Sequence, residues 1–274
     1  MNFLENIIYG LISGICEFLP ISSTGHQALL KHIFGASSPE PIRELLIHFA
    51  MLAAVYLSSA TYLERIKRER KIRTSRKRGI QTDRTISQEL RLIRMAAIPV
   101  LIGVILSAFT SKLGNNIGWL ALFFVFNGIV LYVPEHLAHA NKTAGQLRPI
   151  DSLLIGFMGA FSFLPGFSRI GGSLSCAIGR GADQSKAYNW LLVVSIPAII
   201  LLIVIDIITI FTAGFGTITF LSVLGYLGAA IVTFGSAFAV IHFMRKILVQ
   251  TSTVFFAFYS WGAAFLSFFL YLFT

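Results

Sequence analysis

Long runs of hydrophobic residues, separated by short polar connections, cover most of the chain. Six of these runs are close to the roughly 17–25 residues that cross a bilayer as a helix. They cover residues 44–63, 95–113, 117–135, 187–212, 217–243 and 253–273. Polar residues do not alternate with apolar ones inside the runs, as they would in the strands of a membrane barrel. The pattern predicts an all-α polytopic membrane protein with six transmembrane helices.

Two further apolar stretches, residues 2–34 and 150–182, are each interrupted near the middle by proline, glycine and polar residues. Neither half of either stretch is long enough to span a bilayer. Non-helical backbone is stable at membrane depth only where protein or a water-filled cavity surrounds it. We therefore expect two re-entrant helical hairpins, both buried in the protein.

The two interrupted stretches form an internal repeat. "FLPISS" at Phe18–Ser23 aligns with "FLPGFS" at Phe163–Ser168, an offset of 145 residues. We expect a single membrane domain, 1–274, made of repeat one (1–135) and repeat two (150–274). An odd number of spans separates the hairpins, so the second repeat is expected to have inverted topology. The hairpin tips then meet near the membrane midplane, where inverted-repeat proteins bind their ligands.

Positive charge is concentrated in one segment. The net charge is +10, and more than half of the 22 Lys and Arg residues lie between residues 64 and 94. A basic run can bind nucleic acid, but between membrane spans it is typical of a cytoplasmic loop beside anionic lipid. We therefore expect a basic cytoplasmic loop at 64–94 and no nucleic-acid partner. The threading of the spans then places the C-terminus outside.

The N-terminus and the cysteines add little chemistry. The first residues have neither a basic start nor a small-residue cleavage site, so we expect no signal peptide. Cys16 and Cys176 lie in apolar surroundings and are expected to be buried free thiols.

Polar residues gather at the two expected tips, around the helix starts near Ser23 and Ser168. Helix N-termini attract anions through free N–H groups and the helix dipole. An arginine adds a planar fork that matches phosphate oxygens, and glycines admit close approach of backbone to a ligand. The sequence therefore predicts an oxyanion or phosphate site formed by Ser22, Thr24, Ser168, Arg169, Gly171, Gly172 and Ser173.

Three residues of the first tip are candidates for catalysis. A hydroxyl beside an imidazole can act as a nucleophile with a general base, which fits Ser23 and His26, and the Glu17 carboxylate can orient the imidazole or take a proton. Structural roles stay open for each of them. The serines can cap helices, His26 can be a satisfied interior histidine, and Glu17 can pair with Arg169 only to lock the tips. For Glu44 and His48, an interfacial role and a site role are equally open.

Two motifs carry a resemblance to a known family. "EFLPISSTGH" (Glu17–His26) and "PGFSRIGGS" (Pro165–Ser173) resemble the signature motifs of the bacitracin-resistance family, the undecaprenyl-pyrophosphate phosphatases (BacA/UppP). The resemblance covers nearly the whole chain. It implies a multi-pass protein of the bacterial inner membrane that hydrolyses undecaprenyl pyrophosphate to undecaprenyl phosphate and phosphate. That reaction recycles the lipid carrier of cell-wall synthesis and gives bacitracin resistance, with the site facing the outer side.

The resemblance also implies residue roles and partners. By motif position, Ser23 matches the nucleophile, Glu17 and His26 the other catalytic residues, and Ser168 and Arg169 the phosphate-binding pair. It implies a divalent cation, Mg or Ca, for which Glu17 is the one candidate ligand in the motifs. The expected partners are a polyprenyl pyrophosphate lipid and membrane lipids, and assembly as a homodimer is left open.

Several positions depart from the pattern of the family that the chain resembles. Ser13 stands where the family usually has an acid or glutamine, Gly159 where it often has glutamine, and Ile170 where it has serine. His48 replaces a usual glutamine. These departures keep a second function open, a flippase or transporter for a polyprenyl phosphate with little or no phosphatase activity. A membrane scaffold whose basic loop binds a cytoplasmic partner is a third, and it leaves the tips unexplained.

Overall fold

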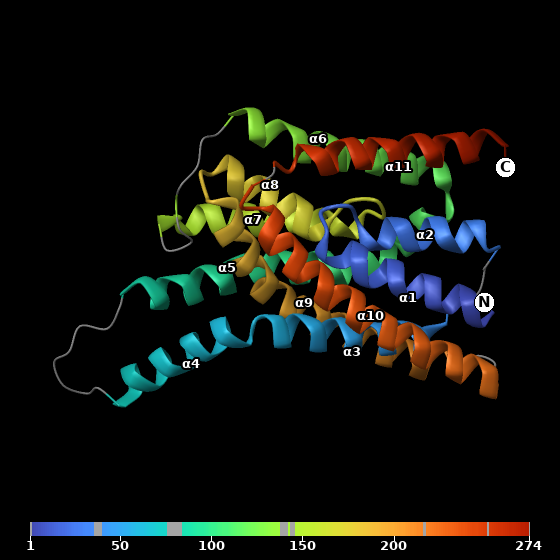
Figure 1. Ribbon diagram of the computed structural model, residues 1–274, viewed down its shortest axis with the longest axis horizontal. Helices are drawn as coiled ribbons and strands as arrows, with labels where there is room; N and C mark the ends of the chain where they lie inside the picture. Colours follow the sequence, from blue (N-terminus) through green and yellow to red (C-terminus); the bar gives the residue numbers. More distant parts are fainter. Residues whose placement is uncertain are drawn as a thin grey trace.

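A computed structural model describes residues 2–35, 40–75, 84–137, 142, 146–215, 218–250 and 252–273, and its elements there are all helices (Figure 1). Six helices are long and apolar enough to cross a membrane. They are α3 (Pro41–Ser58), α5 (Arg84–Thr110), α6 (Ile117–Leu137), α9 (Gln184–Ala213), α10 (Phe220–Ile247) and α11 (Val254–Phe273). The prediction of an all-α membrane protein with six spans is confirmed.

The two remaining apolar stretches each form a broken pair of helices. The first pair is α1 (Phe3–Phe18) and α2 (Ser23–Ile33); the second is α7 (Pro149–Ala160), a short 3₁₀ turn η3 (Phe161–Phe163) and α8 (Arg169–Gly179). Leu19 and Leu164, which precede the prolines, have the extended backbone that proline imposes on its predecessor. We call residues 19–22 tip one and residues 164–168 tip two.

The two broken pairs point in opposite directions along the molecule. In Figure 1, α1 and α2 extend from the middle to the end where both termini lie, whereas α7 and α8 extend to the other end. Helix α1 packs against α10 as α7 packs against α5, and the matching helices α3 and α9 pack on each other, as do α6 and α11. A two-fold relation between the repeats would give this packing. The inverted repeat and the re-entrant insertion stay predictions.

The basic segment is more helical than the expected loop. Helix α4 (Ala60–Ser75) follows α3 after a break at Ser59, and α5 begins at Arg84. Glu89 on α5 accepts hydrogen bonds from Tyr62 (3.0 Å) and Arg65 (2.8 Å) on α4. Glu89 therefore connects α4 to the first part of α5. Glu, Lys and Arg are good helix formers, so a charged run need not be irregular. Residues 76–83 lie outside the described residues.

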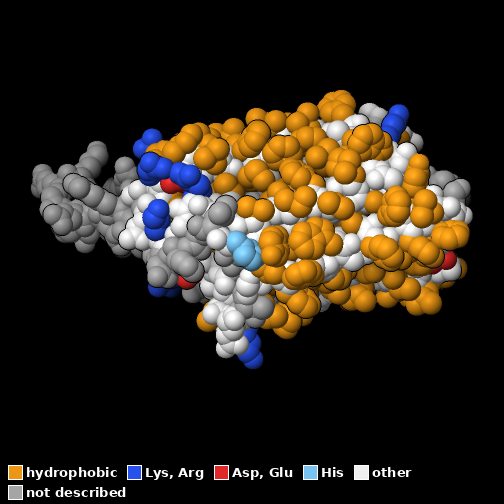
Figure 2. Space-filling model, turned by 90° about the horizontal axis from the view of Figure 1, so that it is seen from above, with side chains coloured by type: hydrophobic (Ala, Val, Ile, Leu, Met, Phe, Trp, Pro, Cys, Tyr) orange, Lys and Arg blue, Asp and Glu red, His pale blue; other side chains and the backbone are white. Residues whose placement is uncertain are grey.

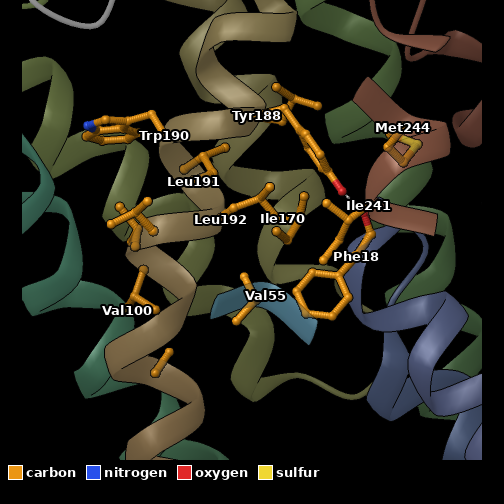
Figure 3. Packing of buried hydrophobic residues seen from close by; sticks show 14 of the residues in the cluster. Phe18, Val55, Val100, Ile170, Tyr188, Trp190, Leu191, Leu192, Ile241 and Met244 are labelled. Atoms are coloured by element: carbon orange, nitrogen blue, oxygen red, sulfur yellow. Dashed lines mark hydrogen bonds between the residues drawn. The ribbon is translucent and has the colours of Figure 1, made fainter. Parts of the chain in front are cut away.

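The surface and the interior of the bundle have different compositions. The face in Figure 2 shows hydrophobic side chains over the middle of the molecule, and most of its Lys and Arg lie at one end. Large apolar side chains such as Phe109, Phe211 and Ile231 are exposed, as suits helices in contact with lipid. Inside, Tyr188 packs among aliphatic side chains and donates a hydrogen bond to Phe18 O (3.1 Å; Figure 3).

Candidate active site

The two tips touch directly, through a hydrogen bond and close backbone approach. Ser22 Oγ of tip one accepts hydrogen bonds from Gly25 N (3.2 Å) in its own hairpin and from Gly166 N (3.1 Å) in tip two. A Cβ added to Gly25 would lie 2.7 Å from Gly166 Cα, so glycine is required for this approach. Ser22 itself has φ 71°, a left-handed conformation that costs energy for a non-glycine residue. The docking of the tips therefore determines the backbone at the start of α2.

Asn127 on α6 connects both tips and was missed from the sequence. Its Oδ1 accepts a hydrogen bond from Ser168 N (2.9 Å) in tip two. Its Nδ2 donates to Pro20 O (3.1 Å) in tip one and to Ser260 Oγ (2.9 Å) on α11. The side chain is fully buried. A polar residue inside the apolar run "FFVFNGIVLY" is itself a sign of function in a membrane span, and it could have indicated Asn127.

Two serines, one in tip two and one in α8, hold this part of the second hairpin in place. Ser168 caps α8, because its Oγ accepts a hydrogen bond from Gly171 N (3.0 Å), and the same hydroxyl donates to Leu19 O (3.3 Å). Ser173 donates from Oγ to Ile155 O (3.1 Å) on α7. The structure thus gives both hydroxyls protein partners. Their predicted contacts with phosphate stay predictions.

The two glycines of the second motif face protein atoms. A Cβ on Gly171 would lie 3.0 Å from Pro20 O, and one on Gly172 would lie 2.6 Å from Phe167 Cε1. Both residues therefore let the tips and α8 pack closely. Their predicted role in admitting a ligand to the backbone stays a prediction.

Arg169 and Glu17 form an ion pair that joins the start of α8 to the end of α1. Arg169 Nη2 donates to Glu17 Oε1, and the two side chains are 10% and 14% exposed. Arg169 Nε is buried and has no hydrogen-bond partner in the described part of the chain. Arg169 also borders a cavity of about 10 Å³ lined by Ser173 and Ser195 among others, space for about one water. The arginine therefore retains unused donor capacity beside its carboxylate partner.

His26 is held at both ring nitrogens. Its Nδ1 lies 2.8 Å from Ser22 O, and a carbonyl can only accept, so Nδ1 carries the hydrogen. In the neutral ring Nε2 is then the acceptor for Tyr259 OH, 3.0 Å away on α11. The Tyr259 ring also stacks on the imidazole, with centroids 5.6 Å apart. Tyr259 lies in an apolar, aromatic-rich span, and nothing in the sequence distinguishes it from the lipid-facing aromatics around it.

We expect Tyr259→Phe to lower kcat about fivefold, because the phenyl ring keeps the stacking but loses a hydrogen bond worth about 1 kcal/mol in positioning His26. The measurement is phosphate release from a polyprenyl pyrophosphate, the substrate that the motif resemblance implies. Phe258→Leu, at an exposed neighbouring position, is the control and should keep its rate. A Tyr259→Phe rate equal to that of the unaltered protein would contradict a positioning role.

Ser23 and Thr24 begin α2. Ser23 is nearly buried, and its hydroxyl makes no hydrogen bond within the described ranges. Thr24 is exposed, with Oγ1 3.4 Å from Ser22 Oγ. The two candidate bases are engaged elsewhere, Glu17 with Arg169 and His26 with Tyr259. Ser23 is therefore a free hydroxyl in this structure, and its role as nucleophile stays a prediction.

The positions that depart from the motif pattern have local partners. Ser13 is fully buried, and its Oγ accepts a hydrogen bond from Gln27 Nε2 (2.9 Å) on α2. A Cβ on Gly159 would lie 2.2 Å from Ser173 Oγ, so glycine there makes room for that serine. Ile170 points into the hydrophobic core near Leu192 and Phe18 (Figure 3). None of the three side chains adds an ionisable group to the tips.

The described residues form no preformed divalent cation site. Among them, no three His, Cys, Asp or Glu side chains gather to hold a metal ion. Glu17, the one candidate ligand, is paired with Arg169, so a cation there would also need oxygens from water and from the substrate phosphates. The cation stays a prediction.

The comparisons with known proteins agree on a family. The family model described as bacitracin resistance protein BacA matches residues 6–266. The chain belongs to the BacA family.

Curated relatives match the BacA-family chain along almost all of its length. Undecaprenyl-diphosphatase 4 of Bacillus thuringiensis subsp. konkukian is 31% identical over 268 residues, 96% of this chain and 95% of the relative. Undecaprenyl-diphosphatase 3 of Bacillus cereus is 30% identical, with the same coverage. Undecaprenyl-diphosphatase of Treponema denticola is 27% identical over 261 residues, 94% of each chain.

Proposed function

We propose that this chain is an undecaprenyl-diphosphatase, which hydrolyses undecaprenyl pyrophosphate to undecaprenyl phosphate and phosphate. The observation that carries the proposal is Arg169, nearly buried at the junction of two helix starts with Glu17 as its ion-pair partner. An arginine at membrane depth is costly and needs a function, and helix N-termini add to its preference for an anion. Family membership and the curated relatives favour the phosphatase over a flippase.

The residues at the tips suggest a sequence of steps. Phosphate oxygens of the substrate replace Glu17 on Arg169, and the N–H groups at the start of α2 and α8 help to hold them. The Ser23 oxygen bonds to the terminal phosphorus, its proton passes to a base, and the bridging P–O bond breaks with its electron pair going to undecaprenyl phosphate. A water oxygen then bonds to this phosphorus, the P–O bond to Ser23 breaks, and a proton from the water returns to the Ser23 oxygen as phosphate leaves. Positioning and charge stabilisation supply most of the rate in phosphoryl transfer.

Phosphate release from purified protein tests this function. Undecaprenyl or farnesyl pyrophosphate is supplied with and without Mg, and Arg169→Ala is assayed beside the unaltered protein. We expect release that depends on Arg169. Transfer of labelled undecaprenyl phosphate across vesicles without any hydrolysis would overturn the phosphatase and support the flippase.

Location is part of the proposal. We place the chain in the bacterial inner membrane, with α4, the start of α5 and the ends of α6 and α10 in the cytoplasm and the tips open to the outer side. Support comes from Arg65, Arg91, Arg148 and Arg245, which lie at that end of the bundle. Positive residues favour the cytoplasmic side. Assembly as a homodimer belongs to the same proposal and is tested by cross-linking of the purified protein.

We expect Thr24→Cys, in a chain carrying Cys16→Ala and Cys176→Ala, to react with an impermeant thiol reagent added outside intact cells. Thr24 is the exposed residue at the start of α2. Lys67→Cys, on an exposed position of α4, is the matched control and should react only after the cells are made permeable. Labelling of the two positions in the opposite order would contradict the proposed orientation.

A further inference from the structure

His48 and Asp206 form a pair that the steps above do not use. His48 Nδ1 on α3 lies 2.6 Å from Asp206 Oδ2 on α9, and each side chain is 14% exposed. The pair joins helices from the two halves of the chain. Ionisable residues inside membrane spans are rare and costly, and a role in function is the first explanation to consider.

The second ring nitrogen of His48 is free. Nε2 makes no hydrogen bond to any described residue, and it keeps some accessible surface. His26 differs, because both of its ring nitrogens are engaged. An imidazole whose Nδ1 is oriented by a carboxylate and whose Nε2 is free has the arrangement of a general base. His48 therefore fits that role better than His26 in this structure.

His48 lies between the outer end of the bundle and the ion pair at the tips. Helices α1 and α3 run in the same direction from the end with both termini (Figure 1), and Tyr9 OH donates to Glu44 Oε1 (2.8 Å) across them. Ser13 lies one helical turn after Tyr9 on α1, and His48 lies one turn after Glu44 on α3. Glu17 follows one turn after Ser13. The charges of Glu44 and Glu17 both act on His48.

More charged side chains lie between His48 and the outer end of the bundle. Glu44 Oε1 accepts a hydrogen bond from Arg43 Nη2 (3.1 Å) and lies 3.7 Å from Lys31 Nζ, which is one-third exposed. Helix α10, also packed on α3, brings Tyr226 near Glu40 and Arg43. The other titratable groups described on α10, His242, Arg245 and Lys246, lie in its last two turns at the opposite end. Polar and charged side chains thus lie between His48 and the water at the outer end, where they can help a proton to leave.

We propose that His48, oriented by Asp206, accepts the proton that hydrolysis releases, a role that rests on the proposed phosphatase function. As the Ser23 oxygen bonds to the terminal phosphorus, its O–H bond breaks and the proton passes through water to His48 Nε2. The bridging P–O bond breaks in the same step, and its electron pair stays on undecaprenyl phosphate. The proton then leaves to water past Glu44 and Lys31. Asp206 is a positioning residue, because it holds the ring with Nε2 as the acceptor.

The pH dependence of kcat/KM tests the proposal with His48→Gln, Asp206→Asn and the double variant. A base works only when unprotonated, so the rate of the unaltered protein should fall at low pH. In His48→Gln this fall should disappear and kcat should drop at least tenfold. The double variant restores a neutral Gln–Asn hydrogen bond, so it should recover thermal stability in detergent without recovering rate. His242→Gln, at an exposed histidine of α10, is the matched control and should keep both rate and pH profile.

Two results would overturn the proposal alone. One is an unchanged pH profile in a folded His48→Gln protein. The other is a double variant that recovers rate together with stability, which would make the pair a structural link between α3 and α9. Failure of the proposed function is recognised separately, because the unaltered protein would then release no phosphate at any pH.

Discussion

Arg169→Lys is expected to lower kcat/KM for undecaprenyl pyrophosphate about 100-fold or more, while the protein still folds and accumulates in the membrane. Lysine keeps the charge and can still pair with Glu17, so the tips stay connected. It loses the planar fork that binds two phosphate oxygens at once. A 100-fold loss corresponds to about 2.7 kcal/mol of transition-state stabilisation, a size typical of losing one oriented donor. Phosphate release gives the rate, and thermal unfolding in detergent reports the fold.

Arg180→Lys is the matched control for that experiment. Arg180 also pairs with a buried carboxylate, with Nη2 2.6 Å from Asp151 Oδ1, but it lies at the end of α8 away from the tips. Its replacement should leave kcat/KM unchanged. Near-normal turnover in Arg169→Lys would instead reduce Arg169 to a structural partner of Glu17.

Asn127→Leu is expected to destabilise the protein by several kcal/mol and to abolish most activity. Leucine has a similar size but leaves Ser168 N and Pro20 O without the hydrogen bonds that Asn127 supplies. Each buried backbone group that loses its partner costs about 1–3 kcal/mol. Because these two groups belong to different tips, the loss should also separate Ser23 from Arg169. Thermal unfolding and phosphate release measure the two effects.

The control for Asn127→Leu is Ser267→Ala. Ser267 is equally buried in α11, the helix packed on α6, but its hydroxyl donates only to Ala263 O of its own helix (2.8 Å). It should keep both stability and rate. An Asn127→Leu protein with normal stability would show that water or a shift of the backbone satisfies the tips, and that Asn127 does not connect them.

The sequence predicts the local features of this structure better than the contacts between residues far apart in the chain. The spans and the breaks at Pro20 and Pro165 follow from local composition, and both appear where they were expected. The basic segment was expected as a loop, yet its described ends are helical, because charge indicates location more directly than backbone conformation.

The partners of the site residues were harder to predict. Asn127 meets Ser168 across 41 residues of sequence, and Tyr259 meets His26 across 233. Such contacts are set by how helices pack, and no spacing within a motif contains them. The pairing of Glu17 with Arg169 was anticipated as one alternative, because an arginine and a carboxylate at membrane depth each need a counter-charge.

That pairing has a consequence for affinity and product release. In the proposed reaction the substrate replaces Glu17 on Arg169, so one counter-ion is exchanged for another and the arginine is not left unpaired. Part of the intrinsic affinity for pyrophosphate is spent on displacing Glu17, which weakens apparent binding of every phosphate ligand alike. A single free phosphate makes fewer contacts than a pyrophosphate with its lipid tail, so the same cost leaves free phosphate with the weaker net binding. In that reaction Glu17 competes with the cleaved phosphate for Arg169 and restores the resting ion pair after each turnover.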